Sequence, residues 1–462
     1  MKKVNYLIVL AVLISWSCSD LLEIEPKSEI PSEQALSKGS NVELTLTSAY
    51  AQLVSDNFLG KNVRLYSELM SDNIGLDEIS FNATDFTGQV ALRNTNVLNK
   101  DVDALWQTGY RAIARANAVI GAVDNNLIID DTSPLLKSEW RAEALFIRAV
   151  AHFELLRLFA LPYSSDPTTD LGIPIRIKPL TTDEIVARST VDKVYEQVIA
   201  DLTAAIADLP ESNGNLADKW AARGYLARVF FNKLDYQNAL QVSTEIINHF
   251  GSLSGNALTP FRNAGNIPAS GAVLFQVVSV GNAFNDFRPS QRRYSINKGT
   301  SSLLYDLSFG RETDYRFNNM VVVDGERHYS LKWDNNQINP PIIRLAEIYL
   351  INAESAARLA NPDLAVASDG YNAVRQFSDP TIAPVNFASA AEALDSLVVE
   401  RRVEMAFEGD RYHELKRLKS ASFGEVKSGS TIIREAKSFD DASWLLKIPV
   451  SETSGNPLIV QN

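Results

Sequence analysis

Three consecutive amphipathic segments in the middle of the chain constrain the fold most strongly. The first covers residues 190–209, and its apolar side chains recur every three or four positions, at Tyr195, Ile199, Leu202, Ile206 and Leu209. This spacing lines one face of a helix with about 3.6 residues per turn, and Pro210 ends the helix because proline cannot continue it. Two further helices are predicted over 217–233 and 236–250. The short turn between them predicts an antiparallel helix pair.

Related segments recur elsewhere in the chain. Stretches that begin at Glu143, Arg223 and Glu347 each mix bulky apolar with small residues and can be laid over one another. Small residues let neighbouring helices approach closely, as helix–turn–helix repeats require. The stretches resemble tetratricopeptide repeats, but they begin 80 and 124 residues apart. Insertions would therefore interrupt the usual period of about 34 residues.

Two regions lack the helical pattern. Residues 71–100 are rich in Asp and Asn, which favour turns and loops. Within residues 251–340, the β-branched stretch 272–280 predicts a strand, and Asp324-Gly325 between residues 320–323 and 327–333 predicts a hairpin. The pattern therefore predicts a mainly α fold, in which a helix-pair scaffold carries an irregular, loop-rich half with small β-hairpins. The remaining predicted helices cover residues 42–53, 101–123, 134–159, 342–359, 363–377 and 388–407, with another turn or two after Gly409.

The N-terminus has the layout of a secretory signal over residues 1–17. Lys2 and Lys3 precede an apolar run that ends at Ile14 and is too short to span a bilayer. Cys18 follows and is the only cysteine in the chain, so it cannot form an internal disulfide. The pattern resembles a bacterial lipoprotein lipobox, which implies cleavage before Cys18 and stable anchoring by several acyl chains. An ordinary secreted protein with an incidental cysteine is the alternative.

Charge and composition exclude several classes of protein. Removal of residues 1–17 would leave 445 residues, and the loss of Lys2 and Lys3 would change the formal net charge from −12 to −14. Because such an acidic chain repels phosphate backbones, a nucleic acid is not expected as a partner. No later stretch is long and apolar enough to cross a membrane. We therefore expect a globular body, with residues 18–40 as its lipidated tether to the membrane.

Four stretches carry a family resemblance. They are Arg141–Phe159 followed by Pro162, Ile343–Glu354, Glu400–Arg417, and Leu446–Pro449 with Asn456-Pro457 and the terminal Gln461-Asn462. In order and spacing they resemble the SusD/RagB family of outer-membrane nutrient-binding lipoproteins, and the lipobox agrees with this resemblance. The third stretch, ERRVEMAFEGDRYHELKR, is the most specific of the four. The resemblance covers essentially the whole chain after the signal.

The resemblance implies a single SusD-like domain over residues 41–462. Members of this family lie as lids on a TonB-dependent outer-membrane transporter of the SusC class, facing the cell exterior. They capture oligosaccharides, or in some members peptides, and have no catalytic activity of their own. Four tetratricopeptide-like helix pairs would form the scaffold, mainly in residues 41–70, 101–250 and 342–420, with ligand loops mainly in 71–100 and 251–340.

The charged third stretch also has a catalytic interpretation. Glu404 and Glu408 would be the acid and base of a glycoside hydrolase, but a buried ion-pair lattice, with Arg401 facing Glu404, is favoured. His413-Glu414 begins like a zinc-protease motif, yet Arg417 stands where the second histidine is needed. The sequence contains no phosphate-binding loop, dinucleotide fingerprint or nucleophile elbow. No catalytic residue, metal or cofactor is therefore expected.

Two loop regions contain the chemistry that sugar recognition needs. Flat aromatic faces stack on pyranose rings, and planar polar groups bridge adjacent hydroxyls. The candidate ligand contacts in residues 72–96 are Asp72, Asn73, Phe81, Phe86, Arg93 and Asn94. Those in residues 282–316 are Phe284, Phe287, Arg288, Arg292 and Tyr294. For each of them, loop packing without ligand contact is the alternative, and the resemblance transfers no site residue here.

The balance of aromatic and charged residues leaves the ligand class open. Of the five tryptophans after the signal, only Trp333 lies near the loop-rich half. Several arginines lie in the second loop region instead, and arginine pairs well with carboxylates. The ligand is therefore expected to be an oligosaccharide, neutral or acidic, with a peptide as the alternative. A glycoside hydrolase and a pure assembly scaffold are the remaining alternatives.

Overall fold

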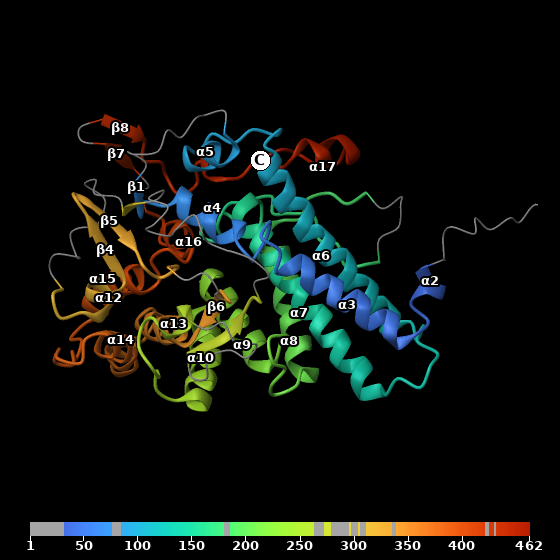
Figure 1. The fold of residues 1–462 in the computed structure, drawn as a ribbon, viewed down its shortest axis with the longest axis horizontal. Helices are drawn as coiled ribbons and strands as arrows, with labels where there is room; N and C mark the ends of the chain where they lie inside the picture. Colours follow the sequence, from blue (N-terminus) through green and yellow to red (C-terminus); the bar gives the residue numbers. More distant parts are fainter. Residues whose placement is uncertain are drawn as a thin grey trace, which may run out of the picture.

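A computed structural model of the chain describes most of the body that the sequence predicts. The described residues are 32–75, 85–179, 185–262, 272–278, 295–296, 304, 311–334, 339–420, 425–428 and 431–462. Most of them lie in helices, so the predicted mainly α fold is confirmed (Figure 1). The predicted signal and Cys18 lie outside the described residues.

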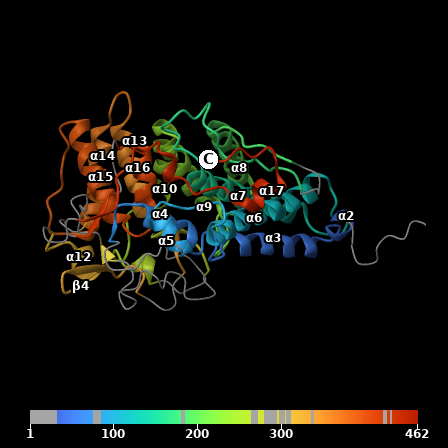
Figure 2. The same cartoon turned by 90° about the horizontal axis from the view of Figure 1, so that it is seen from above.

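The scaffold is a run of helices in which each packs against its neighbour along the chain. Thus α3 packs on α6, α6 on α7, α7 on α8, α8 on α9, α9 on α10 and α10 on α13, which also contacts α14 and α15. Figures 1 and 2 show α3, α6 and α7 toward one end of the molecule and α13, α14 and α15 at the other. The helices are α3 (Gly39–Leu53), α6 (Lys100–Asp124), α7 (Pro134–Phe159), α8 (Val191–Asp208), α9 (Lys219–Asn232), α10 (Tyr236–Phe250), α13 (Leu345–Ala357), α14 (Leu364–Ser378) and α15 (Ala390–Glu404).

Capping side chains set where these helices begin. Ser133, Thr190 and Asp218 accept hydrogen bonds from backbone N–H groups in the first turns of α7, α8 and α9. These bonds satisfy donors that the first turn of a helix leaves without a partner. At its other end, α10 stops at Gly251, whose φ of +69° suits glycine. The helices predicted over 134–159, 190–209, 217–233 and 236–250 are therefore confirmed.

Short strands join the irregular part of the chain to the scaffold. β2 (Val273–Gln276) pairs antiparallel with β6 (Pro341–Arg344), and β4 (Val321–Asp324) pairs with β5 (Arg327–Ser330). The hairpin predicted at Asp324-Gly325 is thus confirmed, and Gly325 supplies the φ of +63° that a primed turn requires. The other antiparallel pairs in the described ranges are β1 (Ile74–Gly75) with β3 (Ser295–Ile296), and β7 (Val426–Ser428) with β8 (Thr431–Arg434).

One predicted helix begins later than expected. The prediction started a helix at Ile342, but residues 341–344 form the buried strand β6 and α13 starts only at Leu345. The strand packs against α9 so closely that a Cβ on Gly224 would lie 2.7 Å from Ile343 Cγ2. A short buried strand has no polar face, so its sequence cannot be distinguished from the first turn of a buried helix.

Shorter helices complete the described chain. The region 71–100, predicted as loops, contains β1 and the two-turn helix α5. None of the helices in the ranges given above is both long and apolar enough to cross a bilayer. The short helices are α2 (Ser32–Ala35), α4 (Asn62–Met70), α5 (Phe86–Ala91), α12 (Tyr315–Asn319), α16 (Asp410–Arg417) and α17 (Val450–Gly455), with single 3₁₀ turns at Thr259–Phe261 and Ala442–Trp444.

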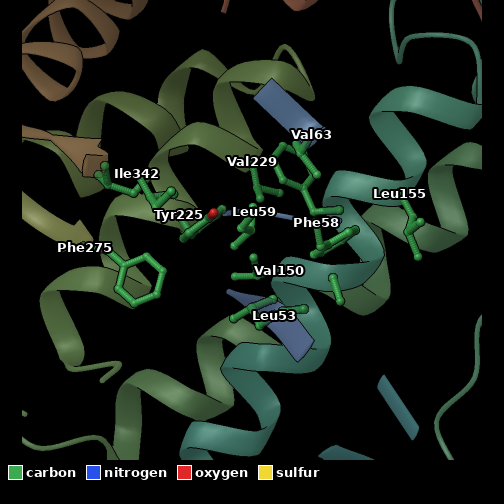
Figure 3. Close-up of a cluster of buried hydrophobic side chains, with 14 of the residues drawn as sticks. Leu53, Phe58, Leu59, Val63, Val150, Leu155, Tyr225, Val229, Phe275 and Ile342 are labelled. Atoms are coloured by element: carbon green, nitrogen blue, oxygen red, sulfur yellow. The ribbon is translucent and has the colours of Figure 1, made fainter. Parts of the chain in front are cut away.

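A continuous hydrophobic core links the scaffold to the irregular half. Figure 3 shows Leu53 and Phe58 from the chain around the end of α3, Val150 of α7, Tyr225 of α9 and Phe275 of β2 in one cluster, and each is at most 2% exposed. The rings of Tyr225 and Phe275 lie edge to face, with their centroids 6.3 Å apart. The β2–β6 ladder is therefore fixed on α7 and α9.

One buried carboxyl group makes the stability depend on pH. Glu143 of α7 is 5% exposed, and its Oε2 accepts a hydrogen bond from Tyr50 Oη at 2.6 Å. Burial raises the pKa of Glu143 to about 7, although the hydrogen bond from Tyr50 acts in the opposite direction. The unfolded chain has a glutamate pKa of about 4.3. Between these two values the folded state holds a proton that the unfolded state has released.

Raising the pH from 5 to 8 is therefore expected to lower the free energy of unfolding, by on the order of 2 kcal/mol from Glu143 alone. Urea titrations at both pH values measure the difference, and Glu143→Gln should remove this component. The matched control is Glu196→Gln, because the Glu196 side chain is exposed and pairs with Lys193 at the surface. A Glu143→Gln variant with the pH dependence of the parent chain would contradict the prediction.

Candidate functional site

The two loop regions predicted to hold the ligand meet at a two-stranded ladder. In this ladder Ile74 of β1 lies opposite Ile296 of β3, and Gly75 lies opposite Ser295. β1 also lies beside β7, and β3 lies beside β5. Figure 1 shows β1, β4, β5, β7 and β8 on one side of the molecule. The chain at Gly75 and the chain at Ser295 thus lie side by side, although they are far apart in the sequence.

Asp72, the first of the candidate residues, is buried just before this ladder. Its Oδ1 lies 3.2 Å from Arg402 Nη2 and 2.9 Å from Arg411 Nε. Burial by itself would raise the pKa of Asp72, but the two guanidinium groups outweigh burial and lower that pKa below its ordinary value. Asp72 therefore ties the end of α4 to α15 and α16.

Asn73 extends the same buried connection. Its Nδ2 donates to Glu68 Oε1 at 2.8 Å, and its Oδ1 accepts from Arg402 Nε at 3.2 Å. Glu68 also accepts hydrogen bonds from the backbone N–H groups of Phe407 and Gly409, at 3.1 and 2.9 Å. Burial raises the pKa of Glu68 to about 7, even though these hydrogen bonds lower it. The turn after α15 is thus fixed to α4, and the φ of +79° at Gly409 suits glycine.

Two arginines hold the end of α4 against α5. The Arg93 guanidinium lies 3.2 Å from the centroid of the Trp444 ring, and its Nη2 donates to the carbonyl of Met70 at 2.7 Å. Arg434 of β8 donates to the backbone carbonyls of Leu69, Ser71 and Ala91. Burial lowers the pKa of Arg434 to about 9. The backbone around the ladder is therefore braced from two sides.

Phe86 and Asn94 are placed differently from the other described candidates. Phe86 is half-buried at the start of α5, where the Asp85 side chain accepts a hydrogen bond from the Gly88 N–H at 3.2 Å. Asn94 is exposed just after the helix. These two side chains lie at the surface beside the braced backbone, whereas Asp72, Asn73 and Arg93 lie beneath it. Their contacts with a ligand stay a prediction. The candidates outside the described residues are Phe81, Phe284, Phe287, Arg288, Arg292 and Tyr294.

The charged stretch Glu400–Arg417 forms buried ion pairs, as predicted. Glu404 lies 2.7 Å from Arg344 Nη1 and 2.9 Å from Arg316 Nη1. Glu408 lies 2.7 Å from Lys332 Nζ and 2.7 Å from Arg344 Nη2. Burial would raise the pKa of Glu404, but Arg344 and Arg316 outweigh burial and lower that pKa to about 2. Glu404 is therefore ionised at neutral pH and cannot act as a general acid there.

One detail of the predicted lattice is wrong. Arg401 does not pair with Glu404; its Nε and Nη2 donate to the two carboxylate oxygens of Asp410, at 2.8 and 2.6 Å. A position three residues along a helix permits a pair, but Glu404 faces Arg344 and Arg316 instead. The chain turns after α15 and returns Asp410 to Arg401, which gives a two-point contact.

The His413 side chain is buried against α4. It is 6% exposed, and its Nε2 lies 3.1 Å from Ser67 Oγ. Burial, with Arg157 and Lys416 nearby, lowers the pKa of His413 well below its ordinary value, so the ring is neutral. In the part of the chain that the structure describes, no group of His, Cys, Asp or Glu side chains is arranged to hold a metal ion.

Sequence reasoning missed two residues that brace this region. Glu68 is the one acidic residue of α4, in a segment that is buried throughout. Arg434 is the one charged residue of β8. A charged residue in a segment with the apolar spacing of a buried element is a usable signal, because such a charge must find a buried partner. The identity of that partner is not contained in the local sequence.

Comparison with known proteins agrees with this architecture. A sequence profile described as "Starch-binding associating with outer membrane" matches residues 20–231, and a profile described as "SusD family" matches residues 237–462. The chain belongs to the SusD family. The resemblance seen in the four sequence stretches is thereby confirmed.

Individual members of the SusD family match nearly the whole chain. SusD-like protein P2 of Formosa agariphila is 24% identical over an alignment of 525 positions, which covers 100% of this chain and 98% of that protein. A structure from Bacteroides vulgatus, described as a putative sugar binding protein, has a TM-score of 0.79 at 25% identity and covers 93% of this chain and 99% of its own. A SusD superfamily structure from Bacteroides thetaiotaomicron has a TM-score of 0.78 at 22% identity, with coverages of 92% and 99%.

Proposed function

We propose that this SusD-family protein is a cell-surface lipoprotein that binds oligosaccharides and passes them to a SusC-class TonB-dependent transporter. The observation that carries the binding proposal is the β1–β3 ladder, from which both candidate loop regions leave the scaffold. The matching profile is described by starch binding and by association with the outer membrane. A similar structure is described as a putative sugar binding protein. Both descriptions support a carbohydrate ligand.

The buried bracing supports a binding role for the surface above it. The backbone beside Phe86 and Asn94 is held in place by the contacts of Asp72, Asn73 and Arg93. A rigid base lowers the conformational entropy that ligand binding would otherwise cost. An aromatic face and a primary amide are also the groups that stack on a pyranose and bridge its hydroxyls.

The same proposal assigns no catalytic step to the chain. Glu404 and Glu408, the pair that a hydrolase would need, lie in ion pairs with Arg316, Arg344 and Lys332. Both carboxylates are nearly inaccessible to solvent, at 4% and 9% exposure. Purified protein is therefore expected to bind glycans without releasing products from them.

Attachment through Cys18 is tested separately from binding. Mass spectrometry of the N-terminal peptide from the membrane fraction should show acyl chains on Cys18. Cys18→Ser should release the protein from membranes, while Ser17→Ala should leave it attached. A Cys18→Ser protein that stays in the outer-membrane fraction would contradict lipid anchoring. Copurification of a large outer-membrane transporter with the parent protein would support the proposed partner.

Phe86→Ala is expected to weaken oligosaccharide binding about fivefold or more, because a lost stacking contact is worth about 1 kcal/mol or more. Asn94→Ala should weaken binding by a smaller factor. Titration calorimetry with maltooligosaccharides, followed by a panel of other glycans, measures both effects. Leu98→Ala is the matched control, since Leu98 is exposed in the same region and is not a candidate contact.

Two results would overturn parts of the binding proposal. Equal affinity of Phe86→Ala and Leu98→Ala for a bound glycan would remove Phe86 from the site. Absence of binding to every glycan, together with peptides that copurify with the protein, would replace the oligosaccharide by a peptide ligand.

A further inference from the structure

A cavity lies on the scaffold, away from the β1–β3 ladder. Its volume is about 400 Å³, within the range typical of small-molecule sites, and it opens between α6, residues 173–179 and α17. Figure 1 shows α6 and α17 on the side of the molecule opposite the hairpin β4–β5. Nothing in the proposed delivery role accounts for this cavity.

One wall of the cavity is aromatic and apolar. The partly exposed side chains of Tyr110 and Ala114 form this wall along α6. The Tyr110 ring packs on the buried Trp106 ring, with their centroids 4.8 Å apart. The Tyr110 hydroxyl donates to the carbonyl of Pro174 at 2.9 Å, so the ring is held in place. Such a wall suits the C–H face of a sugar ring better than it suits a fully hydrated ion.

The facing wall is polar, and its carboxylate, on Glu452, is already paired with the Arg176 guanidinium. Glu452 of α17 accepts hydrogen bonds from Trp106 Nε1 at 3.2 Å, Asn456 Nδ2 at 3.2 Å and Arg176 Nη2 at 3.3 Å. The Arg176 guanidinium also lies 5.7 Å from the centroid of the Tyr110 ring. Glu452 therefore compensates the charge of Arg176 and is positioned by fixed donors.

Additional positive charge lines the cavity. Arg111 is exposed on α6, and its Nη2 donates to the Gln107 side-chain oxygen at 2.6 Å. Lys178 also lines the cavity. The cavity thus has three cationic side chains and one carboxylate, although the whole chain has a net charge of −12. Guanidinium groups recognise carboxylates through two parallel hydrogen bonds.

We propose that this cavity is a second binding site, for a saccharide that carries a carboxylate. The carboxylate lies against Arg111, the apolar face of the sugar lies against Tyr110 and Ala114, and Gln107 and Ser451 bond the hydroxyls. The class of ligand rests on the proposed carbohydrate-binding function. The location and the charge preference rest on the cavity alone.

The test is titration calorimetry of the full-length chain with trigalacturonate and with its neutral methyl ester. The acid is expected to bind and the ester to bind at least tenfold more weakly. Arg111→Gln should weaken binding of the acid about tenfold. The matched control is Arg115→Gln, which removes the same charge one turn along α6 but outside the cavity, and it should change the affinity less than twofold. Glu452→Gln should strengthen binding, because Arg176 becomes available to the ligand.

Each contrary outcome identifies what has failed. No binding of the acid, equal binding of acid and ester, or equal effects of Arg111→Gln and Arg115→Gln would overturn the cavity proposal. If Phe86→Ala abolishes binding of the acid while Arg111→Gln retains it, the ligand binds at the loop half, and only the cavity proposal falls. If the acid binds as expected but no neutral glycan binds the parent chain, the loop site fails and the cavity site stands.

Discussion

Replacing Glu404 by alanine is expected to lower the free energy of unfolding by about 3 to 5 kcal/mol. Glu404 is 4% exposed and accepts hydrogen bonds from Arg344 Nη1 at 2.7 Å and from Arg316 Nη1 at 2.9 Å. Without Glu404, Arg344 and Lys332 share the carboxylate of Glu408, so the buried positive charges are less fully compensated. A buried charge without its partner cannot recover its lost hydration.

Urea unfolding of the parent and variant chains at pH 7 measures this effect. The control is Glu196→Ala, which breaks a pair of similar length, 2.7 Å, between side chains that are at least half exposed. That control should cost less than about 1 kcal/mol, because water solvates both charges. A Glu404→Ala variant that is no less stable than Glu196→Ala would show that the lattice contributes little to stability. Such a result would also reopen the catalytic interpretation of Glu404.

The second large effect is expected at Arg434. Replacing it with methionine removes the donors to the buried carbonyls of Leu69, Ser71 and Ala91. Each buried carbonyl left without a donor costs about 1 to 3 kcal/mol. Because these three carbonyls belong to the end of α4, the residue after it and the end of α5, the loss should appear as local opening rather than as global unfolding.

Amide hydrogen exchange resolves this difference between local and global effects. In Arg434→Met, the amides of residues 69–75 and 86–94 are expected to exchange about ten to one hundred times faster, while those of α7 and α9 keep their rates. Lys437→Met is the matched control, because Lys437 is a partly exposed cation whose nearest carboxylate, on Glu435, is 3.8 Å away. Uniformly faster exchange in the whole chain would contradict the local role of Arg434. Under the proposed function, the variant should also lose most of its oligosaccharide affinity.

Local sequence patterns predicted the helices well, for an identifiable reason. The recurring apolar positions between Tyr195 and Leu209 face one side of α8, and Pro210 ends the segment as expected. Asp218 and Ser133 supplied caps whose geometry depends only on nearby backbone. The prediction was wrong where burial hides the period, as in the strand β6 before α13.

For the candidate site, the sequence predicted the loop regions but not which of their residues lie at the surface. Composition indicated the two loop regions, and β1–β3 pairing places their ends together. Composition did not separate residues beneath the surface, such as Asp72, from residues on it, such as Asn94. Both side chains are planar, polar and suited to sugars, so residue type alone does not distinguish a brace from a contact. Burial and the positions of Arg402 and Arg411 make that distinction for Asp72.

By itself, the sequence determined the helical scaffold and the chain's membership in the SusD family, and it predicts lipid attachment at Cys18. These properties depend on spacings within a few turns of chain or on motifs that are contiguous. Only the tertiary structure decided that Arg401 pairs with Asp410, that Glu404 pairs with Arg316 and Arg344, and that a cavity opens beside α6 and α17. Charges find partners through space, and the distance between two groups along the chain does not set their distance in the folded protein.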